Sequence, residues 1–443
     1  MITCPLAQAG TLYVDNVSNC MGLTTCYSSI QEALNNAVTD DEIRIFPGTY
    51  PEAVDLSLMG SALGVATDGN LRFITVDENN NVAARTVQVS PLNGSAFTHS
   101  NNTFDGNLEF DGLVVLSTDD DGIDFDAING NITMRNMTAS GNNKDGIDLE
   151  INTSGYSIGI YDSITDNNGD RGLNLDGPDA TEVIIRNTQA NNNIDEGISV
   201  EADSIADALD VTILDSLTQN NGDTSHDSAG IVVVSVGSLL VSNLYASDNH
   251  GPGLAIIDVT ETTILDSIFE RNAVTEEFSG IFLESAGVFL VTRSIFSDNG
   301  YAGVNVYETF IPGNELTALN INCSSFSGNQ LGVLLNDSAE ITASYNINHS
   351  NFINHTIAGI HAALENDAIA ASNNWWGDAT GPTHSDNIAG MGDRVSDSID
   401  DAIGGALGTV NYLPFVMAPI SIKQYPTDIL FAGDFDGNIC SQL

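Results

Sequence analysis

Ten short segments with one shared pattern recur along the chain, and they limit its fold more than any other feature. Each has a glycine, then Ile, Leu or Val, then alternating residues, as in Asp121-Gly-Ile-Asp-Phe-Asp. The glycines stand at 122, 146, 172, 197, 230, 253, 280, 303, 332 and 359, so successive steps are 23 to 33 residues long. Such a period is typical of a solenoid, in which each repeat forms one coil and stacks on its neighbours.

An asparagine recurs just upstream of each glycine and supports the same register. The positions are Asn142, Asn168, Asn193, Asn221, Asn249, Asn272, Asn299 and Asn329, and His355 takes the next place. Asparagine tolerates a left-handed backbone at a coil corner, and stacked amides can hydrogen-bond from coil to coil. We therefore expect a structural asparagine ladder. Short alternating segments such as Ile264-Leu-Asp-Ser-Ile-Phe read as strands with one inward face.

Together these patterns predict an all-β protein, a parallel β-helix of about ten or more coils with both ends closed. At residues 1–50 we expect an N-terminal cap, because Ser29-Ile-Gln-Glu32 has the pattern of a capping box and opens a short amphipathic helix. Residues 51–415 form the predicted β-helix. Its closing segment, Asn373-Asn-Trp-Trp-Gly377, places both tryptophans as a lid rather than as a sugar platform. Residues 416–443 leave the repeat as a C-terminal tail.

The balance of charge is strongly acidic. Asp and Glu outnumber Lys and Arg by 60 to 11, which gives a formal charge of −49. Such a surface repels nucleic acid and anionic lipid, so neither is an expected partner. Acidity of this degree has two interpretations, solubility in salt water or binding of divalent cations by oxygen ligands. The apolar content of 42% is too high for a disordered acidic chain, so a core is expected.

The cysteines indicate an oxidising compartment. Cys20 and Cys26 flank a short loop that a disulfide can close. Cys323 falls in a strand pattern and is interpreted as a small buried hydrophobe, while the pairing of Cys4 and Cys440 stays open. No stretch reaches the length of a membrane helix, and Met1 to Gly10 is too short for a signal peptide. We therefore expect a mature secreted or cell-surface chain whose export signal has been removed.

Three segments carry a family resemblance. They are Ser29-Ile-Gln-Glu-Ala-Leu, Ile43-Arg-Ile-Phe-Pro-Gly-Thr-Tyr50, and the Asn-Asn-Trp-Trp-Gly ending with Gly381-Pro382. With the repeats, they resemble the pectin-lyase-like superfamily of right-handed parallel β-helix proteins over roughly residues 11 to 415. The resemblance implies the right-handed fold. It leaves function open, because that superfamily includes lyases, hydrolases, epimerases, adhesins and surface proteins.

Acidic residues gather in the first coils, and they suggest a calcium site. Outward residues after each glycine are expected to stack in two columns about 4.8 Å apart per coil. One column reads Asp124, Asp148, Asn174 and Ser199, and the other Asp126, Glu150, Asp176 and Glu201, with Asp121, Asp145 and Asp170 at the neighbouring corner. Stacked like charges repel, and Ca²⁺ accepts six to eight oxygen ligands. A hydrated acidic face is the alternative. A weaker calcium-loop fragment, Asp434-x-Asp436-Gly-Asn438, lies in the tail.

The same patch supports a second hypothesis, a calcium-dependent polysaccharide lyase. As the resemblance implies, such enzymes neutralise a uronate carboxylate with calcium while a Lys or Arg removes a proton, and Lys144 and Arg171 lie among these acids. The two cations are better explained as counter-ions that hold the acidic columns together. Gly-His-Gly and Arg-x-Pro-x-x-Arg, typical of pectin-degrading members, are absent from the sequence. The leading hypothesis is therefore a non-catalytic, calcium-stabilised scaffold for adhesion, glycan contact or surface assembly. Its expected partners are an extracellular polysaccharide, a neighbouring surface protein or a second copy.

Overall fold

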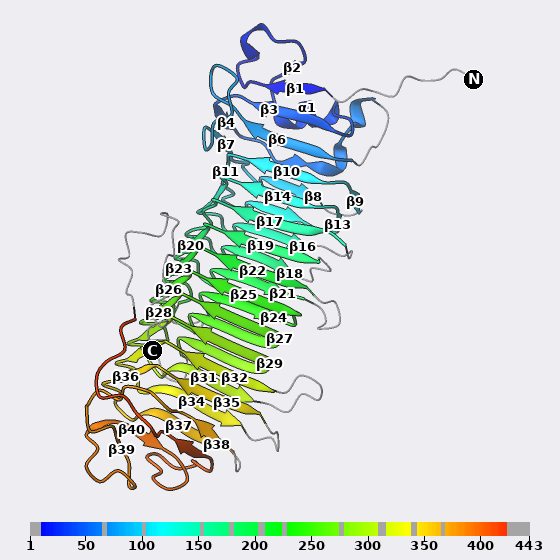
Figure 1. The fold of residues 1–443 in the computed structure, drawn as a ribbon. Helices are drawn as coiled ribbons and strands as arrows, with labels where there is room; N and C mark the ends of the chain where they lie inside the picture. Colours follow the sequence, from blue (N-terminus) through cyan, green and yellow to red (C-terminus); the bar gives the residue numbers. More distant parts are fainter. Residues whose placement is uncertain are drawn as a thin grey trace. The chain divides into compact units, whose positions relative to one another are not determined.

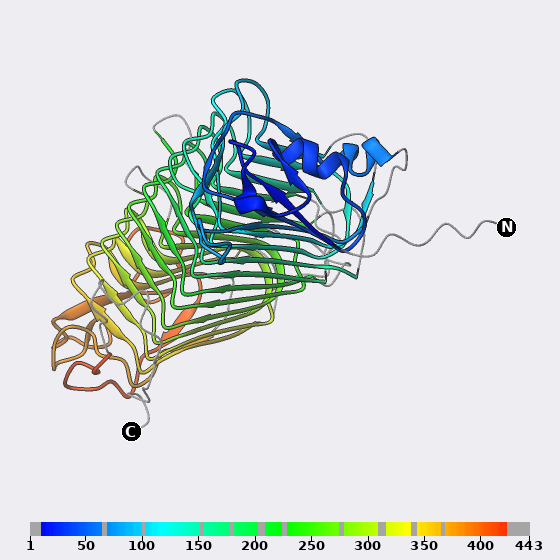
Figure 2. The same ribbon diagram turned by 90° about the horizontal axis from the view of Figure 1, so that it is seen from above.

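The computed structural model describes residues 10–63, 69–99, 103–150, 155–176, 181–202, 209–223, 228–273, 279–308, 316–337, 343–364 and 368–422. The fold consists of two compact units, residues 1–194 with 198–203, and residues 195–197 with 204–443. Within each unit, parallel strands stack in coils (Figures 1 and 2). The described part of the chain has no helix long and apolar enough to cross a membrane. The predicted boundaries at residues 50 and 415 stay a prediction.

In the first unit, successive coils place their strands in three parallel series, here called faces 1, 2 and 3. Face 1 contains β1 (Thr11–Val14), β2 (Cys26–Tyr27), β3 (Asp41–Ile45), β6 (Leu71–Thr75), β10 (Leu108–Asp111), β14 (Ile132–Arg135), β17 (Ser157–Tyr161) and β19 (Glu182–Arg186). Face 2 contains β4 (Gly48–Tyr50), β7 (Val87–Val89), β11 (Leu113–Val115), β15 (Thr138–Ala139) and β20 (Gln189–Asn191). Face 3 contains β5 (Val54–Asp55), β8 (Phe97–His99), β12 (Ile123–Phe125), β16 (Ile147–Glu150), β18 (Leu173–Asp176) and β21 (Ile198–Glu201). A separate pair, β9 (Phe104–Asp105) and β13 (Ile128–Asn129), lies at a corner.

The second unit repeats the arrangement. One series contains β22 (Asp210–Leu214), β25 (Ser238–Ser242), β32 (Ala318–Asn322), β35 (Ser344–Asn348), β38 (Ala368–Ala370) and β41 (Thr409–Asn411). A second contains β23 (Leu217–Gln219), β26 (Tyr245–Ser247), β28 (Ile268–Glu270), β30 (Ile295–Ser297), β33 (Ser325–Ser327) and β36 (Asn351–Ile353). A third contains β24 (Ile231–Val234), β31 (Ala302–Glu308), β34 (Leu331–Asp337), β37 (Ala358–Leu364), β39 (Pro382–Thr383) and β40 (Gly392–Ser396). The strands β27 (Leu254–Leu265) and β29 (Ile281–Thr292) are long enough that each takes part in both the third and the first series.

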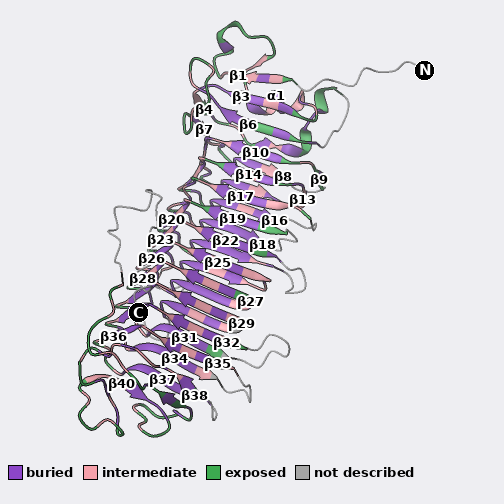
Figure 3. Ribbon diagram, viewed as in Figure 1, coloured by how far each residue is buried: buried purple, intermediate pink, exposed green. Residues whose placement is uncertain are grey.

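The core of each unit lies inside its coils, and alternate residues of each strand enter it (Figure 3). Aromatic side chains at equivalent positions stack from coil to coil. In the second unit, the rings of Phe269, Phe296, Phe326, Phe352 and Trp376 form one continuous stack, with successive centroids 4.8 to 5.2 Å apart. The spacing of these rings therefore follows the coil repeat that the sequence predicts.

The asparagine ladder is confirmed, with one correction to its physical cause. Asn168 accepts hydrogen bonds from the backbone N–H and the Nδ2 of Asn142, at 3.1 and 3.0 Å, and donates its own Nδ2 to Asn193 Oδ1 at 3.0 Å. The same pattern links Asn221, Asn249, Asn272, Asn299 and Asn329 in the second unit. The left-handed residue is not the ladder asparagine but the one before it, such as Asn167 with φ of 60°. The ladder positions need a buried amide, rather than a special backbone.

The repeating glycines are required by close approach of neighbouring coils. A Cβ added to Gly146 would lie 2.5 Å from the carbonyl oxygen of Gly172 and 2.8 Å from Asn168 Nδ2. Its φ is not in the left-handed region, so space rather than backbone freedom selects glycine here.

The N-terminal segment contains the predicted helix and disulfide. Helix α1 (Ile30–Asn35) is shorter than its apolar pattern suggests, and Ser29 Oγ accepts the backbone N–H of Glu32 at 3.1 Å. Glu32 accepts from Ser28 rather than Ser29, so the reciprocal half of the capping box is shifted by one residue. Three 3₁₀ turns, η1 (Cys20–Gly22), η2 (Leu56–Leu58) and η3 (Ser61–Leu63), complete this region. A role for α1 in capping the solenoid stays a prediction.

Cysteine and tryptophan positions are in part as expected. Cys20 and Cys26 form the predicted disulfide. Cys323 is buried but disulfide-bonded, so its interpretation as a plain hydrophobe is wrong. Cys4, Cys440 and the calcium-loop fragment at 434–438 lie outside the described residues. Trp376 is fully buried on Phe352, as a lid requires, whereas Trp375 is only half-buried.

Candidate functional site

The predicted acidic columns exist on face 3 of the first unit. Asp124 of β12 is in register with Asp148 of β16, which is in register with Asn174 of β18. The second column joins Glu150, Asp176 and Glu201 through the same strand pairs. Asp126 is the exception, because β12 ends at Phe125 and leaves Asp126 exposed just beyond the strand.

The corner acids are held by the backbone of the next coil. Asp121, only 5% exposed, accepts the N–H of Asp145 on Oδ1 at 2.8 Å. Asp145, 6% exposed, accepts the N–H of Arg171 in the same way at 2.6 Å. Asp170 lies half-buried at the next corner. One oxygen of Asp121 and one of Asp145 therefore serve the fold, which the sequence alone did not indicate.

Burial raises the pKa of four of these carboxyl groups. It raises the pKa of Asp145 to about 7, and that of Asp121 to about 6. Burial, with repulsion from Asp126 and Asp148, raises the pKa of Asp124 to about 6. Burial and repulsion from Asp121 raise the pKa of Asp148 to about 6, although the Asn174 amide, 2.9 Å from Oδ1, opposes this. The columns can therefore relieve their repulsion by taking up protons near neutral pH.

The two candidate bases behave as counter-ions. Lys144 Nζ lies 2.5 Å from Asp120 Oδ1 and 3.9 Å from Asp121 Oδ2. The hydrogen bond to Asp120 raises the pKa of Lys144, so the amine stays protonated and is a poor proton acceptor. Arg171 is anchored to the corner by its backbone N–H to Asp145. Lys144 is therefore not poised as the base of a lyase, and the role of the Arg171 side chain stays a prediction.

The donor set of the columns fits calcium only in part. Among the described residues, no three or more His, Cys, Asp or Glu side chains are arranged to hold one metal ion. Asp121 and Asp145 each commit one oxygen to a backbone N–H, and Asn174 directs a donor rather than an acceptor at Asp148. A closed cage of protein oxygens is therefore not formed by these side chains.

A pocket on face 1 of the first unit was not predicted. It has a volume of about 360 Å³ and lies over β6, β10 and β14. Arg72, Glu109 and Thr133 line it from adjacent strands in register, whereas Leu71 and Leu108, which also border it, are buried at 0% and 1% exposure. Arg72 is held by Glu109 at 2.7 Å and by Glu42 at 2.8 Å, which fixes its guanidinium at the pocket wall.

One edge of this pocket is a second, exposed amide ladder. Asn70 Oδ1 accepts the N–H of Asn107 at 3.0 Å, and Asn107 Oδ1 accepts that of Asn131 at 2.8 Å. The available sequence signal was the recurrence of Gly-Asn-Leu or Gly-Asn-Ile at residues 69, 106 and 130. The glycines at 69 and 106 precede the first aligned glycine, and the one at 130 falls between two aligned glycines. They were therefore not found by aligning the main repeat.

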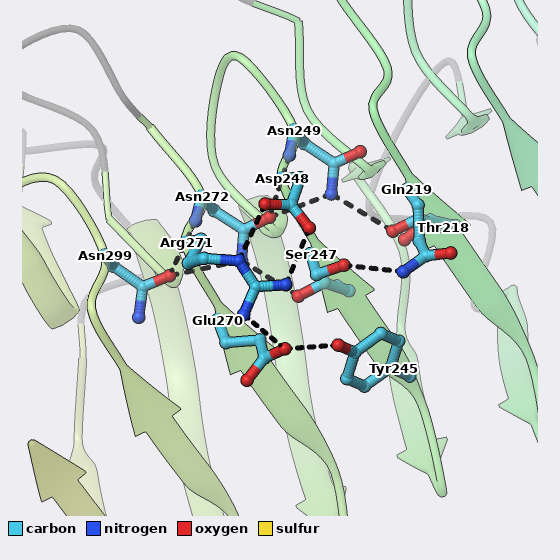
Figure 4. A network of polar contacts seen from close by, with 11 residues as sticks. Thr218, Gln219, Tyr245, Ser247, Asp248, Asn249, Glu270, Arg271, Asn272 and Asn299 are labelled. Carbon is cyan, nitrogen blue, oxygen red and sulfur yellow. Dashed lines mark hydrogen bonds and ion pairs between the residues drawn. The ribbon is translucent and has the colours of Figure 1, made fainter. Parts of the chain in front are cut away.

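In the second unit, a separate polar network surrounds Arg271 (Figure 4). Arg271 makes two 2.8 Å contacts with Asp248 and one of 2.6 Å with Glu270, which also accepts the Tyr245 hydroxyl. These contacts raise the pKa of Arg271, and the hydrogen bond from Arg271 lowers that of Asp248. The charged side chains of this network are bonded to one another, so we interpret the network as a structural link between the coils of β26 and β28.

The comparisons with known proteins concern the solenoid. Residues 178–320 match the family model described as the right handed beta helix region. The chain is a right-handed parallel β-helix. The predicted right-handed β-helix is thereby confirmed over these residues, and membership of the pectin-lyase-like superfamily stays a prediction. No curated protein matches the chain.

Several solved structures are similar at low identity. The catalytic domain of a GH87 α-1,3-glucanase is 13% identical with a TM-score of 0.44, over 75% of this chain and 64% of that one. The A-module of the mannuronan C-5 epimerase AlgE6 from Azotobacter vinelandii is 14% identical with a TM-score of 0.38, over 88% and 94%. Tailspike protein 2 of an Escherichia coli O157:H7 bacteriophage is 10% identical with a TM-score of 0.48, over 91% and 46%. At these scores none of the likenesses carries a functional conclusion. The chain spans less than two thirds of the glucanase domain and less than half of the tailspike.

Proposed function

We propose that this chain is an extracellular, non-catalytic β-helix scaffold that contacts a glycan through the face 1 pocket. The pocket on β6, β10 and β14 is the observation that carries the proposal. Its walls combine a guanidinium, the two carboxylates of Asp40 and Glu109, amides and a hydroxyl, which donate to and accept from sugar hydroxyls. The Cys20–Cys26 disulfide favours an oxidising, extracellular location.

A binding role is favoured over catalysis by the placement of titratable groups. Asp124 and Asp148, whose raised pKa suits a general acid, lie on face 3, whereas the pocket is on face 1. Within the pocket, Glu109 is tied to Arg72 at 2.7 Å. The lyase alternative loses support because the raised pKa of Lys144 keeps that amine charged.

The pocket is tested by filling it. Thr133→Tyr places a ring into the pocket from the centre of β14, and Thr212→Tyr is the matched control, an outward half-buried threonine of β22. Binding to a panel of polysaccharides is measured by affinity electrophoresis, with reducing ends and unsaturated products followed in parallel. We expect retarded migration without turnover, lost in Thr133→Tyr and kept in Thr212→Tyr. Equal retardation of both variants, or turnover, contradicts the proposal.

Calcium is proposed as a stabiliser of face 3 rather than as a catalyst. Because the described side chains form no closed cage, the ion would bind at the outward oxygens of Asp124 and Asp148, with water completing its shell. A ligand that binds only the folded state raises the melting temperature. Thermal unfolding with calcium and with chelator at pH 8 measures this directly. An unchanged melting temperature would contradict calcium binding. Uptake of protons would then remain as the process that relieves the repulsion between the stacked carboxylates.

A further inference from the structure

A column of cationic and aromatic side chains runs beside the pocket on face 1 of the first unit. Asp111, Arg135, Tyr161 and Arg186 occupy equivalent positions on β10, β14, β17 and β19. The Arg135 guanidinium lies over the Tyr161 ring, 4.4 Å from its centroid. Arg85 reaches the same place and donates from Nη2 to the carbonyl oxygen of Asp162 at 3.0 Å. Arg135 thus lies on this tyrosine, Arg85 contacts the turn that follows it, and Arg186 is the in-register neighbour of the tyrosine on β19.

Two of these arginines differ from the other cations of the chain. Within the described residues, neither Arg85 nor Arg135 has a carboxylate at ion-pair distance, although acids outnumber cations by 60 to 11. The cations that do have a carboxylate partner include Arg44, Arg72, Lys144, Arg271, Arg293 and Arg394. A guanidinium that has no carboxylate partner in so acidic a chain retains hydrogen-bond donors and its positive charge for a ligand.

Two neighbouring carboxylates, one in register with Arg135 and one on the residue that Arg85 contacts, are already engaged by amides. Asp111 Oδ1 accepts Asn136 Nδ2 at 2.8 Å, and Asp162 Oδ1 accepts Asn187 Nδ2 at 2.5 Å. The two arginines are positioned by other means, Arg135 by stacking on Tyr161 and Arg85 by a backbone carbonyl. Both means orient a guanidinium without neutralising it, as recognition of an anion requires.

The column and the pocket are parts of one surface. Outward residues two apart on a strand are neighbours, so Glu109 of the pocket adjoins Asp111, and Thr133 adjoins Arg135. We propose that Arg85 and Arg135, with Tyr161, bind an anionic group, a carboxylate or sulfate, carried by the glycan whose neutral part occupies the pocket. The proposal rests on the proposed function and narrows it to acidic glycans, recognised by arginine without calcium.

The test compares Arg85→Gln and Arg135→Gln with Arg394→Gln, a control at a half-buried arginine of the second unit that pairs with Asp400. Binding of a polyuronate, a sulfated polysaccharide and a neutral glucan is measured in chelator at two ionic strengths. We expect an acidic polymer to bind more tightly than the glucan, with an affinity that falls as salt rises and falls at least threefold in each of the first two variants. The preferred polymer tells carboxylate from sulfate. Unchanged affinity in both variants, or preference for the neutral glucan, overturns the proposal.

Free glucuronate separates this inference from the proposed function. If no polymer binds, the glycan-scaffold function fails, and chemical-shift changes on titrating glucuronate then decide the anion site alone. Shifts in the wild type that disappear in the Arg85→Gln, Arg135→Gln double variant support the site. An absence of shifts, or shifts that persist in that variant, overturns it.

Discussion

At the scale of single residues, the buried polar groups of the ladder and of the acidic corner bond to the neighbouring coil. Asn168 is 1% exposed, and its amide joins three coils through Asn142 and Asn193. Asp121 and Asp145 play a related part at the next corner, where each accepts a backbone N–H. Removal of one such group leaves several partners buried and unpaired, which costs more than the bond itself.

The ladder prediction follows from Asn168. Asn168→Ala deletes the acceptor for the N–H and Nδ2 of Asn142 and the donor to Asn193, so we expect a loss of about 3 kcal/mol in the free energy of unfolding. The matched control is Asn143→Ala, since Asn143 is exposed and its amide bonds only the Asp119 carbonyl oxygen. Urea unfolding measures both. Equal losses of unfolding free energy in the two variants would show that the buried ladder contributes no more to stability than an exposed amide.

A second residue-scale prediction concerns the sign of the pH dependence. Burial raises the pKa of Asp145 to about 7, above its unfolded value of 3.8, so the folded state binds the proton more tightly. This contribution is fully present below about pH 4 and is lost as pH rises through 7. Asp145→Asn keeps the acceptor for Arg171 but removes the charge. We expect its melting temperature to exceed the wild type by a few degrees at pH 8 and to match it near pH 4, in chelator. A variant less stable at pH 8 would contradict the assignment.

At the scale of elements, regular parts of the fold were predictable and irregular parts were not. Gly146 and Asn168 recur at coil spacing because backbone approach and amide stacking impose them, so the sequence repeats visibly. The pocket arises where coils are uneven, since Arg72 and Glu109 lie 37 residues apart whereas Glu109 and Thr133 lie 24 apart. The anion column was hidden for another reason. Arg85 meets Asp162 across 77 residues, a contact that no repeat implies.

The aromatic stack gives an element-scale prediction. Phe326 is fully buried between Phe296 and Phe352, so Phe326→Ala removes two ring contacts and opens a cavity. We expect a loss of about 3–5 kcal/mol in unfolding free energy. Phe282→Ala is the control, because Phe282 stacks on Tyr307 and is only half-buried. Comparable losses for the two variants would show that the stack adds little to the second unit.

At the scale of the whole molecule, the proposed function assigns ligand binding to face 1 of the first unit and places the acidic columns on face 3. Face 3 concentrates carboxyl groups that need protons or a cation, whereas face 1 carries the pocket and two arginines without acidic partners in the described chain. A chain with a formal charge of −49 repels acidic polymers at long range. The two arginines on face 1 would offset that repulsion locally. Added salt would screen the long-range repulsion of an acidic polymer, and it would also weaken the contact between the polymer and these arginines.

The most direct measurement of the central claim is glycan binding by the intact protein with product analysis in the same sample. The account predicts that wild-type protein and Thr212→Tyr bind an extracellular polysaccharide, that Thr133→Tyr does not, and that no new chain ends appear in any sample. Binding that survives in Thr133→Tyr, or the appearance of reducing ends or unsaturated products, would contradict a non-catalytic contact at the face 1 pocket.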